Sequence, residues 1–379
     1  MSKLYLPTAE QFDRTLANLA QIANALSTKI DVSSGDWESI ARAVRSGIAP
    51  SLYPIGSELT VLHSKYGEMN YEVVAHDYFK NPRNESAPTM TLMSVNLMPS
   101  LQYDSAEAFY YANSSLPAGT YNFTISNVYS SWSAGTYQFT LTKPVPAMGQ
   151  LAISNNAATV LTSLKVRSYA SRIATDYMEE VAITIGNGGT SLGTLGNELN
   201  HVHRVSYGSN NYKESAIRQF LNSEGVVGSV WNPQTKYDRP PSWVGTADGF
   251  MRGFDADFLS VVGKVRVPCS TNSTYEAPDS ATIKGNKYTL NDRFYLPSQK
   301  EIFGDLAGTV DDGSTQFIRY EKADSVDFIK YRDNVASMWR TRTPNPWPAH
   351  DTRVVGTDGV STPNSAASSI PFAVLCTIV

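Results

Sequence analysis

The apolar residues of this chain follow three successive patterns, and the first is helical. Between residues 6 and 30, apolar side chains recur at alternating steps of four and three, which predicts a helix with a heptad stripe. The stripe consists of Phe12, Leu16, Leu19, Ala23, Leu26 and Ile30. It fits a short coiled coil or a helix packed on its own domain. A second helix is predicted from Asp36 to Gly47, and we expect residues 1–50 to form an N-terminal segment for oligomerisation or attachment.

From Tyr53 the pattern changes to period two, which is typical of half-buried strands. The alternating segments are 59–62, 71–75 and 89–94. Residues 105–196 are richer in glycine, serine and aromatic residues, with predicted strands at 121–125, 137–141, 150–154 and 181–185. Short strands at this spacing favour a small β-sandwich. We interpret it as a module inserted into a domain formed by residues 51–104 and 197–379.

Helical patterns return twice in the second half of the chain. Apolar residues of 212–225 form one face of a helix that Gly225 ends. Ser298 and Glu301 form a capping box, which predicts a short helix ending at Gly304. The intervening segment 231–243 contains three prolines, which exclude regular structure there.

The C-terminal stretch combines short strands with polar connections. Strands are predicted at Trp339–Pro344, Thr352–Val355 and Pro371–Val379, and the last is expected to be buried because it is almost entirely apolar. Gly356–Gly359 predicts a turn, and the Ser- and Asn-rich residues 360–370 predict a loop. Loops on a rigid scaffold are where binding residues usually lie.

Composition excludes several classes of function. The chain has 379 residues, of which 41% are apolar and 17% charged, as in a globular protein of two or three domains. A net charge of -4 offers no broad basic field, so we expect no nucleic-acid binding. No apolar run is long enough to insert in a membrane, and the N-terminus has no apolar core like that of a signal peptide.

The end of the chain lacks five residue types. Lys, Glu, Gln, Met and Trp account for 53 of the 379 residues, so residues 348–379 should contain about four or five of them at average usage. They contain none. Polar loops and β-strands are poor in these residue types in any case. This explanation is as good as one in which the codons of this segment are restricted.

No catalytic or metal-binding constellation stands out. His201 and His203 would share one face of a strand, but no third ligand accompanies them, so we favour a surface or structural pair. Cys269 and Cys376 lack a metal-binding spacing and are predicted to be buried or free thiols. Asp311-Asp312-Gly313 is predicted to be an acidic turn rather than part of a calcium site. We expect no cofactor, no metal and no enzymatic activity.

A binding surface requires aromatic and hydrogen-bonding groups at loop tips. Trp347 lies between two prolines, and its exposure is costly unless a ligand covers it; alternatively, it fills the base of its own loop. The candidate ligand-binding residues are Asn345, Trp347, His350, Asp351, Thr352, Asn364, Ser365 and Ser368. We expect the presented surface to comprise 345–352 and 361–369.

Several segments together resemble the DUF6273 family of C-type-lectin-like domains, which is common in phages and gut bacteria. These segments are Ser215–Asn222, Phe294–Ser298 with Glu301, Trp339–Pro344 and the terminal Pro-x-Ala strand. The resemblance spans 53–104 and 197–379 and skips the insert. Arg340-Thr341 departs from the family pattern, which usually has an aromatic residue and a leucine there, and Phe220 stands where tryptophan is commoner.

The resemblance implies an α+β fold with a C-type-lectin-like domain, in which Trp339 and Arg342 belong to a core strand. The wider superfamily includes formylglycine-generating enzymes, which use redox-active cysteines at a copper site, and variable phage proteins such as the major tropism determinant. In those variable proteins, retroelements diversify C-terminal residues at adenines. Adenine changes in AAC-type codons cannot produce Lys, Glu, Gln, Met or Trp, which agrees with the gap in the tail.

These implications lead to a functional expectation. We expect a phage virion protein, made in the bacterial cytoplasm and located at a tail or fibre tip, that binds a host-surface protein or glycan. Its other partners would be virion proteins and further copies of itself, most plausibly in a trimer. The alternatives are a structural decoration protein of the virion and an oxidase of the formylglycine-generating type.

Overall fold

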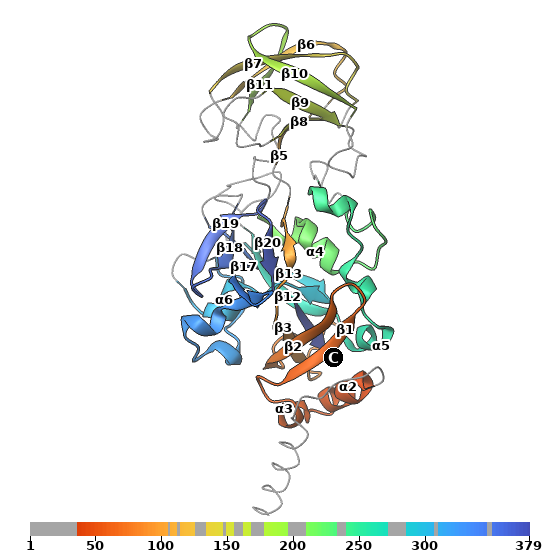
Figure 1. Cartoon of the computed structure of the whole chain (residues 1–379), viewed down its shortest axis with the longest axis vertical. Coiled ribbons are helices and arrows are strands. Elements are labelled where there is room, and N and C mark those ends of the chain that lie inside the picture. Colours follow the sequence, from red (N-terminus) through yellow and green to blue (C-terminus); the bar gives the residue numbers. More distant parts are fainter. Residues whose placement is uncertain are drawn as a thin grey trace, which may run out of the picture.

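The computed structural model is a mixed structure in which strands outnumber helices (Figure 1). It describes residues 36–104, 107–111, 114–125, 134–146, 149–154, 162–167, 178–195, 210–232, 240–271, 286–306, 310–346 and 351–379. The helix expected over residues 6–30 lies outside these ranges. Within them, no helix is long and apolar enough to cross a membrane.

The first described helix, α2 (Trp37–Arg45), packs on the body of the molecule (Figure 1). Asp36 occupies its N-cap position, and Gly47 follows its end with a positive φ of 76°, as predicted. The ring of Trp37 lies 4.7 Å from that of Phe258, which belongs to α5 (Ala256–Val261). The apolar face of α2 is therefore used inside the molecule.

The central sheet brings together segments from both ends of the described chain. Its order is β1 (Glu58–His63), β2 (Gly67–His76), β3 (Met90–Ser94), β21 (Leu375–Ile378) and β14 (Phe294–Tyr295). The strands predicted near residues 59, 71 and 89 are confirmed. The apolar C-terminal strand β21 lies between β3 and β14, and all four of its residues are buried.

A second five-stranded sheet carries the C-terminal candidate residues. Its order is β19 (Ser361–Ser365), β18 (Asp351–Val355), β17 (Trp339–Pro344), β20 (Ile370–Phe372) and β4 (Met98–Leu101). The loop predicted over 360–370 is wrong in its first half, because residues 361–365 pair with β18 along the sheet edge. Their polar, proline-containing sequence concealed this strand.

The predicted terminal strand over residues 371–379 is divided between the two sheets. β20 pairs with β4 and β17, whereas β21 pairs with β3 and β14. At the crossing, the Val374 N–H donates to the Ser94 hydroxyl at 2.9 Å, and the Ser94 N–H donates to the Val374 carbonyl at 2.9 Å. The chain thus changes sheets beside the end of β3.

Helices and hairpins cover these two sheets. They are α3 (Ala49–Leu52), α4 (Ala216–Leu221), α6 (Gln299–Phe303), the hairpin of β12 (Val265–Thr271) with β13 (Asn286–Asp292), and the hairpin of β15 (Lys330–Arg332) with β16 (Val335–Ser337). Single 3-10 turns are η2 (Tyr212–Glu214), η3 (Ser242–Gly245), η4 (Phe250–Gly253), η5 (Ile318–Tyr320) and η6 (Ser325–Phe328).

One predicted helix is shorter than expected, and another is confirmed. α4 ends at Leu221 rather than Gly225, because the side-chain amide of Asn222 donates to the carbonyl of Phe294 and accepts the N–H of Arg293. These bonds tie the helix end to β14. The capping box of Ser298 and Glu301 begins α6 as predicted, and Gly304 follows its last residue with a φ of 69°.

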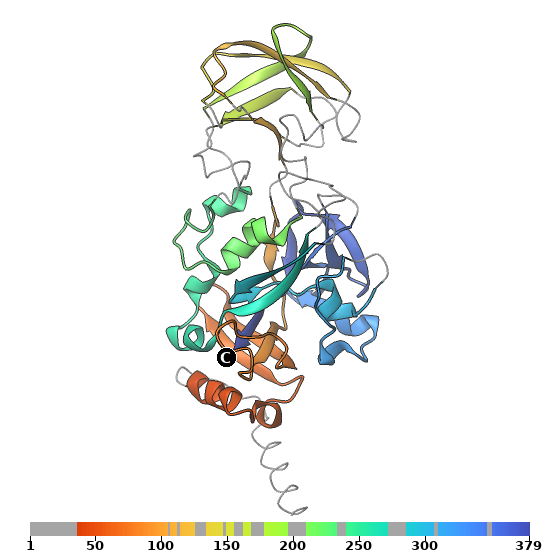
Figure 2. The ribbon, with the colours of Figure 1, turned by 180° about the vertical axis from the view of Figure 1, so that it is seen from behind.

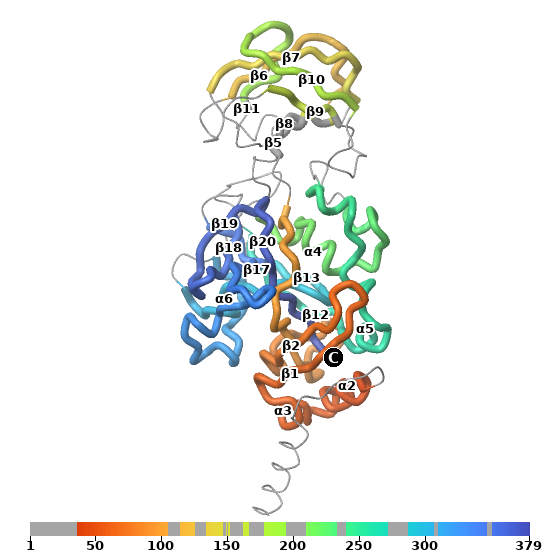
Figure 3. The backbone as a smooth tube through the Cα atoms, viewed as in Figure 1, coloured from red at the N-terminus to blue at the C-terminus, as the bar shows by residue number. Residues whose placement is uncertain are grey.

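Seven further strands form a sheet with its own hydrophobic core, at the end of the molecule remote from α2 (Figures 2 and 3). In order they are β11 (Thr190–Leu195), β6 (Gly119–Ile125), β7 (Gly135–Leu141), β10 (Glu179–Ile185), β9 (Ser163–Arg167), β8 (Gln150–Ser154) and β5 (Glu107–Tyr111). β10 pairs with β9 through residues 179–182 and with β7 through residues 183–185. The four strands predicted in this segment are confirmed.

Candidate ligand-binding surface

The framework of the C-terminal sheet is β17, in which every residue is buried. Trp339 is completely buried, and its indole N–H donates to the Phe328 carbonyl at 2.9 Å. Arg340 and Arg342 are also buried, so two cations point into the protein from one six-residue strand. A buried guanidinium needs acceptors for its protons, and the two arginines find them in different ways.

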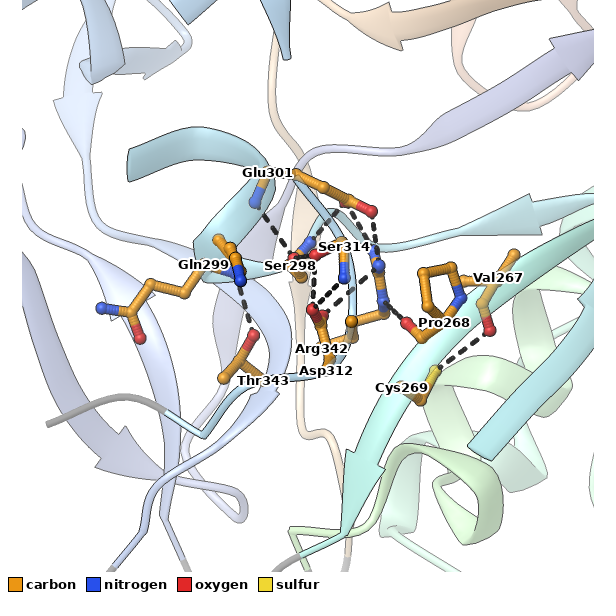
Figure 4. Close-up of polar contacts among 12 residues, drawn as sticks. Val267, Pro268, Cys269, Ser298, Gln299, Glu301, Asp312, Ser314, Arg342 and Thr343 are labelled. Carbon is orange, nitrogen blue, oxygen red and sulfur yellow. Dashed lines mark hydrogen bonds and ion pairs between the residues drawn. The ribbon is translucent and has the colours of Figure 1, made fainter. Parts of the chain in front are cut away.

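Arg342 lies in a network of buried carboxylates and carbonyls (Figure 4). Its guanidinium forms a two-pronged ion pair with Glu301, at 2.7 Å for Nη1 to Oε2 and 2.5 Å for Nη2 to Oε1. It also donates to the carbonyls of Leu296 at 2.8 Å and Pro268 at 3.0 Å, and Nη2 lies 3.6 Å from Asp312. This one side chain therefore joins β17 to α6, to β12 and to the loop containing Asp312.

The electrostatics of this network favour a charged arginine. Burial by itself lowers the pKa of Arg342, but the Glu301 and Asp312 carboxylates outweigh it and hold that pKa well above its ordinary value. Glu301 also accepts the N–H of Ser298 at 2.8 Å, and the hydroxyl of Ser298 accepts the N–H of Glu301. The capping box that begins α6 is thus part of the same buried network, which fits the framework role expected for Arg342.

Arg340 has neutral acceptors instead. Its Nη1 donates to the Thr352 hydroxyl, and its Nη2 donates to the carbonyls of Ser365 at 3.0 Å and Ser368 at 2.9 Å. Its guanidinium carbon lies 5.7 Å from the centre of the Tyr103 ring. Burial lowers the pKa of Arg340 to about 10, so the side chain is still charged at neutral pH. Position 340 therefore places a buried cation beneath the C-terminal segment.

Other groups hold the same segment through its main chain. The amide of Gln102 donates to the Ala367 carbonyl at 2.8 Å. The backbone N–H groups of Tyr103 and Asp104 donate to the Ala366 carbonyl at 2.8 and 3.1 Å. Together with Arg340, these donors reach four consecutive carbonyls, those of residues 365–368. The segment is thus positioned mainly through its backbone, with one further bond in which the Ser365 hydroxyl accepts the Ala367 N–H at 3.2 Å.

The second candidate segment is held in a similar way. The N–H of Asn345 donates to the Asp351 carbonyl at 2.9 Å, which closes the loop between β17 and β18. From outside the loop, the side-chain amide of Asn210 donates to the carbonyls of Asn345 at 3.3 Å and Asp351 at 2.8 Å. Trp347 and His350, at the centre of this candidate segment, lie outside the described residues.

The pairing of β18 with β19 sorts the candidate side chains onto two faces. Asp351 pairs with Ser365, and Thr352 pairs with Asn364. Because paired residues of antiparallel strands share a face, Asn364 lies on the side of the buried Thr352, where its amide is 3.5 Å from the sulfur of Met338. Asp351 and Ser365 lie on the other side.

The structure brings six of the eight candidates to one region but does not expose them all. Asn345 and Thr352 are buried, so their side chains belong to the interior, and their prediction as part of the presented surface is corrected. Thr352 lies in β18, where its hydroxyl accepts from Arg340, and Asn345 directly follows β17, where its N–H closes the loop onto Asp351. Asp351, Asn364, Ser365 and Ser368 are partly exposed. The accessible surface is therefore narrower than the sequence predicted.

The groups considered for catalysis lie elsewhere. Both cysteines are unpaired and buried, as predicted, Cys269 in β12 and Cys376 in β21. The Asp311 carboxylate accepts hydrogen bonds from Lys287, from the Gly313 N–H and from Lys300. These bonds hold the pKa of Asp311 well below its ordinary range. Among the described residues, no three His, Cys, Asp or Glu side chains gather as metal ligands. His201 and His203 lie outside these residues.

The protein therefore has a mixed fold of helices and sheets. Hydrogen bonds to main-chain carbonyls anchor the segment at the end of its β18–β19 hairpin. A family model, the domain of unknown function DUF6273, matches residues 173–374, just over half of the chain, and the chain belongs to this family. The match includes β10 and β11 of the seven-stranded sheet but not β1 to β4. No curated protein and no solved structure matches the chain.

Proposed function

We propose that this protein binds host-surface ligands through the β18–β19 hairpin and the segment that follows it, as a phage virion protein at a tail or fibre tip. In this proposal the two five-stranded sheets form a C-type-lectin-like domain, and the seven-stranded sheet is a β-sandwich-like insertion. The ligand is a protein or glycan of the host cell. The resemblance described above is the source of the virion assignment.

The observation that carries the proposal is the backbone anchoring of residues 365–368. Arg340, Gln102 and two backbone N–H groups hold four consecutive carbonyls there. A carbonyl is present whatever the side chain, so these bonds survive most substitutions at the same positions. Such an arrangement supports a surface whose side chains can change while its shape is kept, and a rigid backbone lowers the entropic cost of binding.

Anchoring of this kind also suits diversification by a retroelement. The absence of Lys, Glu, Gln, Met and Trp from residues 348–379 agrees with mutagenesis confined to adenines of AAC-type codons. A reverse transcriptase gene beside the coding sequence, together with a near-copy of the 3′ end that differs at adenines, is the expected genomic finding. Their absence would contradict diversification but leave ligand binding in place.

Attachment and assembly are assigned to other parts of the chain. We assign the heptad stripe of residues 12–30 to a homotrimer, because the apolar face of the next helix, α2, is already buried against α5. The insertion contributes to assembly or to docking onto other virion proteins. The expected oligomer is measured by light scattering of the full chain and of a chain starting at Asp36, which should be monomeric.

Host-cell binding is the direct test. The purified full chain is applied to a panel of gut bacterial strains and to a glycan array, beside a variant in which Trp347, His350 and Asp351 are replaced by alanine. We expect saturable binding that the triple variant reduces at least tenfold, because a few central residues dominate most interfaces. The matched control is Thr184→Ala, an exposed position on the seven-stranded sheet, which should bind like the unchanged protein.

Other outcomes would favour the alternatives. Absence of binding to every strain and glycan, together with binding of the protein to assembled virions, would favour a structural decoration protein. Copper-dependent oxidation of a cysteine peptide would favour an enzyme of the formylglycine-generating type. The burial of both thiols speaks against that chemistry, because burial raises the pKa of Cys269 to about 12 and so disfavours the reactive thiolate.

A further inference from the structure

A groove of about 470 Å³ lies beside the end of β21, next to α5. Its walls come from the β2–β3 connection, the link from α5 to β12, and the link from β13 to β14. Three cationic residues line it, Arg83, Lys264 and Arg293, and no aspartate or glutamate does. The whole chain carries a net charge of -4, so this groove has a local charge opposite to that of the protein.

The cations of the groove are poorly matched by carboxylates. Among the residues that the structure describes, no aspartate or glutamate forms an ion pair with Arg83 or Lys264, and Arg293 is paired with Glu224 at 4.0 Å. Lys264 directly precedes and Arg293 directly follows the end of the β12–β13 hairpin at which Val265 pairs with Asp292. The hairpin therefore brings two like charges to the groove, and a concave surface strengthens their attraction for an anion.

In a neighbouring groove of about 460 Å³, the positive charges are balanced by carboxylates. It also contains two cations, Lys80 and Arg266, but Glu85 and Asp77 line it as well. Arg266 forms an ion pair with Glu85 at 2.6 Å. Lys264 of the first groove directly precedes β12, and Arg266 of the second lies in β12. The two grooves differ in charge balance, so the positive charge of the first is not a general property of this side of the molecule.

The remaining polar groups of the groove indicate the rest of the ligand. Asn81 and Asn291 contribute side-chain amides, and Ser260 contributes a hydroxyl. The Asn81 oxygen already accepts the backbone N–H of Arg83, which leaves its NH2 group, and the Ser260 hydroxyl donates to the Asp257 carbonyl, which leaves it as an acceptor. Amides and hydroxyls both donate and accept hydrogen bonds, as sugar hydroxyls require. The volume lies within the range of sites that hold small ligands. We propose that this groove binds an acidic saccharide, with Arg83, Lys264 and Arg293 around its phosphate or carboxylate.

This site is independent of the hairpin surface, because its residues belong to other elements and another sheet. Titration calorimetry of the full chain with glucose 6-phosphate, glucuronate, glucose and inorganic phosphate tests it. Both acidic sugars should bind, glucose should not, and inorganic phosphate should bind at least tenfold more weakly than glucose 6-phosphate. Raising the salt concentration to about 0.5 M should weaken the binding of both acidic sugars, since exposed charges are screened.

Two variants locate the site. The double variant Arg83→Ala/Lys264→Ala removes two exposed side chains and should weaken binding of glucose 6-phosphate at least tenfold, because hydrogen bonds to charged groups contribute strongly. Arg266→Ala, the control in the neighbouring groove, should leave binding unchanged. The inference is overturned if neither acidic sugar binds, if inorganic phosphate binds as tightly as the sugar phosphate, if the double variant binds normally, or if Arg266→Ala causes an equal loss.

Discussion

Arg342 and Arg340 lie two residues apart on β17, yet they stabilise different parts of the protein by different means. Arg342 is bound to the carboxylate of Glu301, with Asp312 nearby, and joins elements of the framework. Arg340 is bound mainly to carbonyls of the C-terminal segment. The first arrangement depends on particular side chains, whereas the second depends largely on the backbone. One strand thus stabilises both a fixed core and, through its backbone, the C-terminal segment.

The largest effect is expected from Arg342→Ala. It leaves two buried carboxylates without their cation and should reduce the free energy of unfolding by about 3–5 kcal/mol. Urea denaturation followed by tryptophan fluorescence measures this loss. Arg342→Lys is the matched control. It should lose less stability, because lysine keeps the positive charge although it cannot form the two-pronged ion pair with Glu301. A loss below about 1 kcal/mol, as at an exposed ion pair, would contradict the framework role.

Arg340→Met comes next. The substitution removes the guanidinium bonds to the carbonyls of Ser365 and Ser368, although the Ser365 carbonyl keeps the N–H of Ser368. It should cost roughly 1–3 kcal/mol. Hydrogen exchange should accelerate at residues 361–370 and remain unchanged in β3 and β21. Exchange that accelerates equally in the central sheet would show that Arg340 belongs to the framework and would remove the contrast between the two arginines.

Asn210→Ala should have a smaller and more local effect. Its side-chain amide donates to the carbonyls of Asn345 and Asp351, and its loss should cost about 1 kcal/mol. The expected change is faster hydrogen exchange at 345–351 with little change at 361–369. If both segments loosen together, they form a single cooperative unit rather than two separately anchored ones.

Local sequence patterns predicted the parts of the fold that depend on neighbouring residues. The capping box of Ser298 and Glu301 and the positive-φ glycine at position 47 are such cases, since both act within one helix. The strand at 361–365 was missed because its polar residues lie at a sheet edge, where burial does not select apolar side chains. The change of sheet near Val374 depends on Ser94, far away in the sequence.

The candidate site was predicted in part. The C-terminal region was identified from its residue types, and Arg342 was assigned to the framework. The burial of Asn345 and Thr352 was not foreseen, because polar residues near a loop are ordinarily exposed. The anchoring role of Arg340 could not be inferred, since its acceptors are main-chain carbonyls brought close only by folding. Its departure from the family pattern was the one available signal.

The central claim is that the side chains of the hairpin surface determine binding while its backbone anchors determine its shape. The most direct measurement randomises Ser368 and the exposed Ser369 and records, for each variant, the unfolding midpoint and the binding to host cells. The account predicts stabilities within about 0.5 kcal/mol of one another, with binding that varies more than tenfold. Stabilities that fall in step with binding, or binding that does not change across the set, would contradict it.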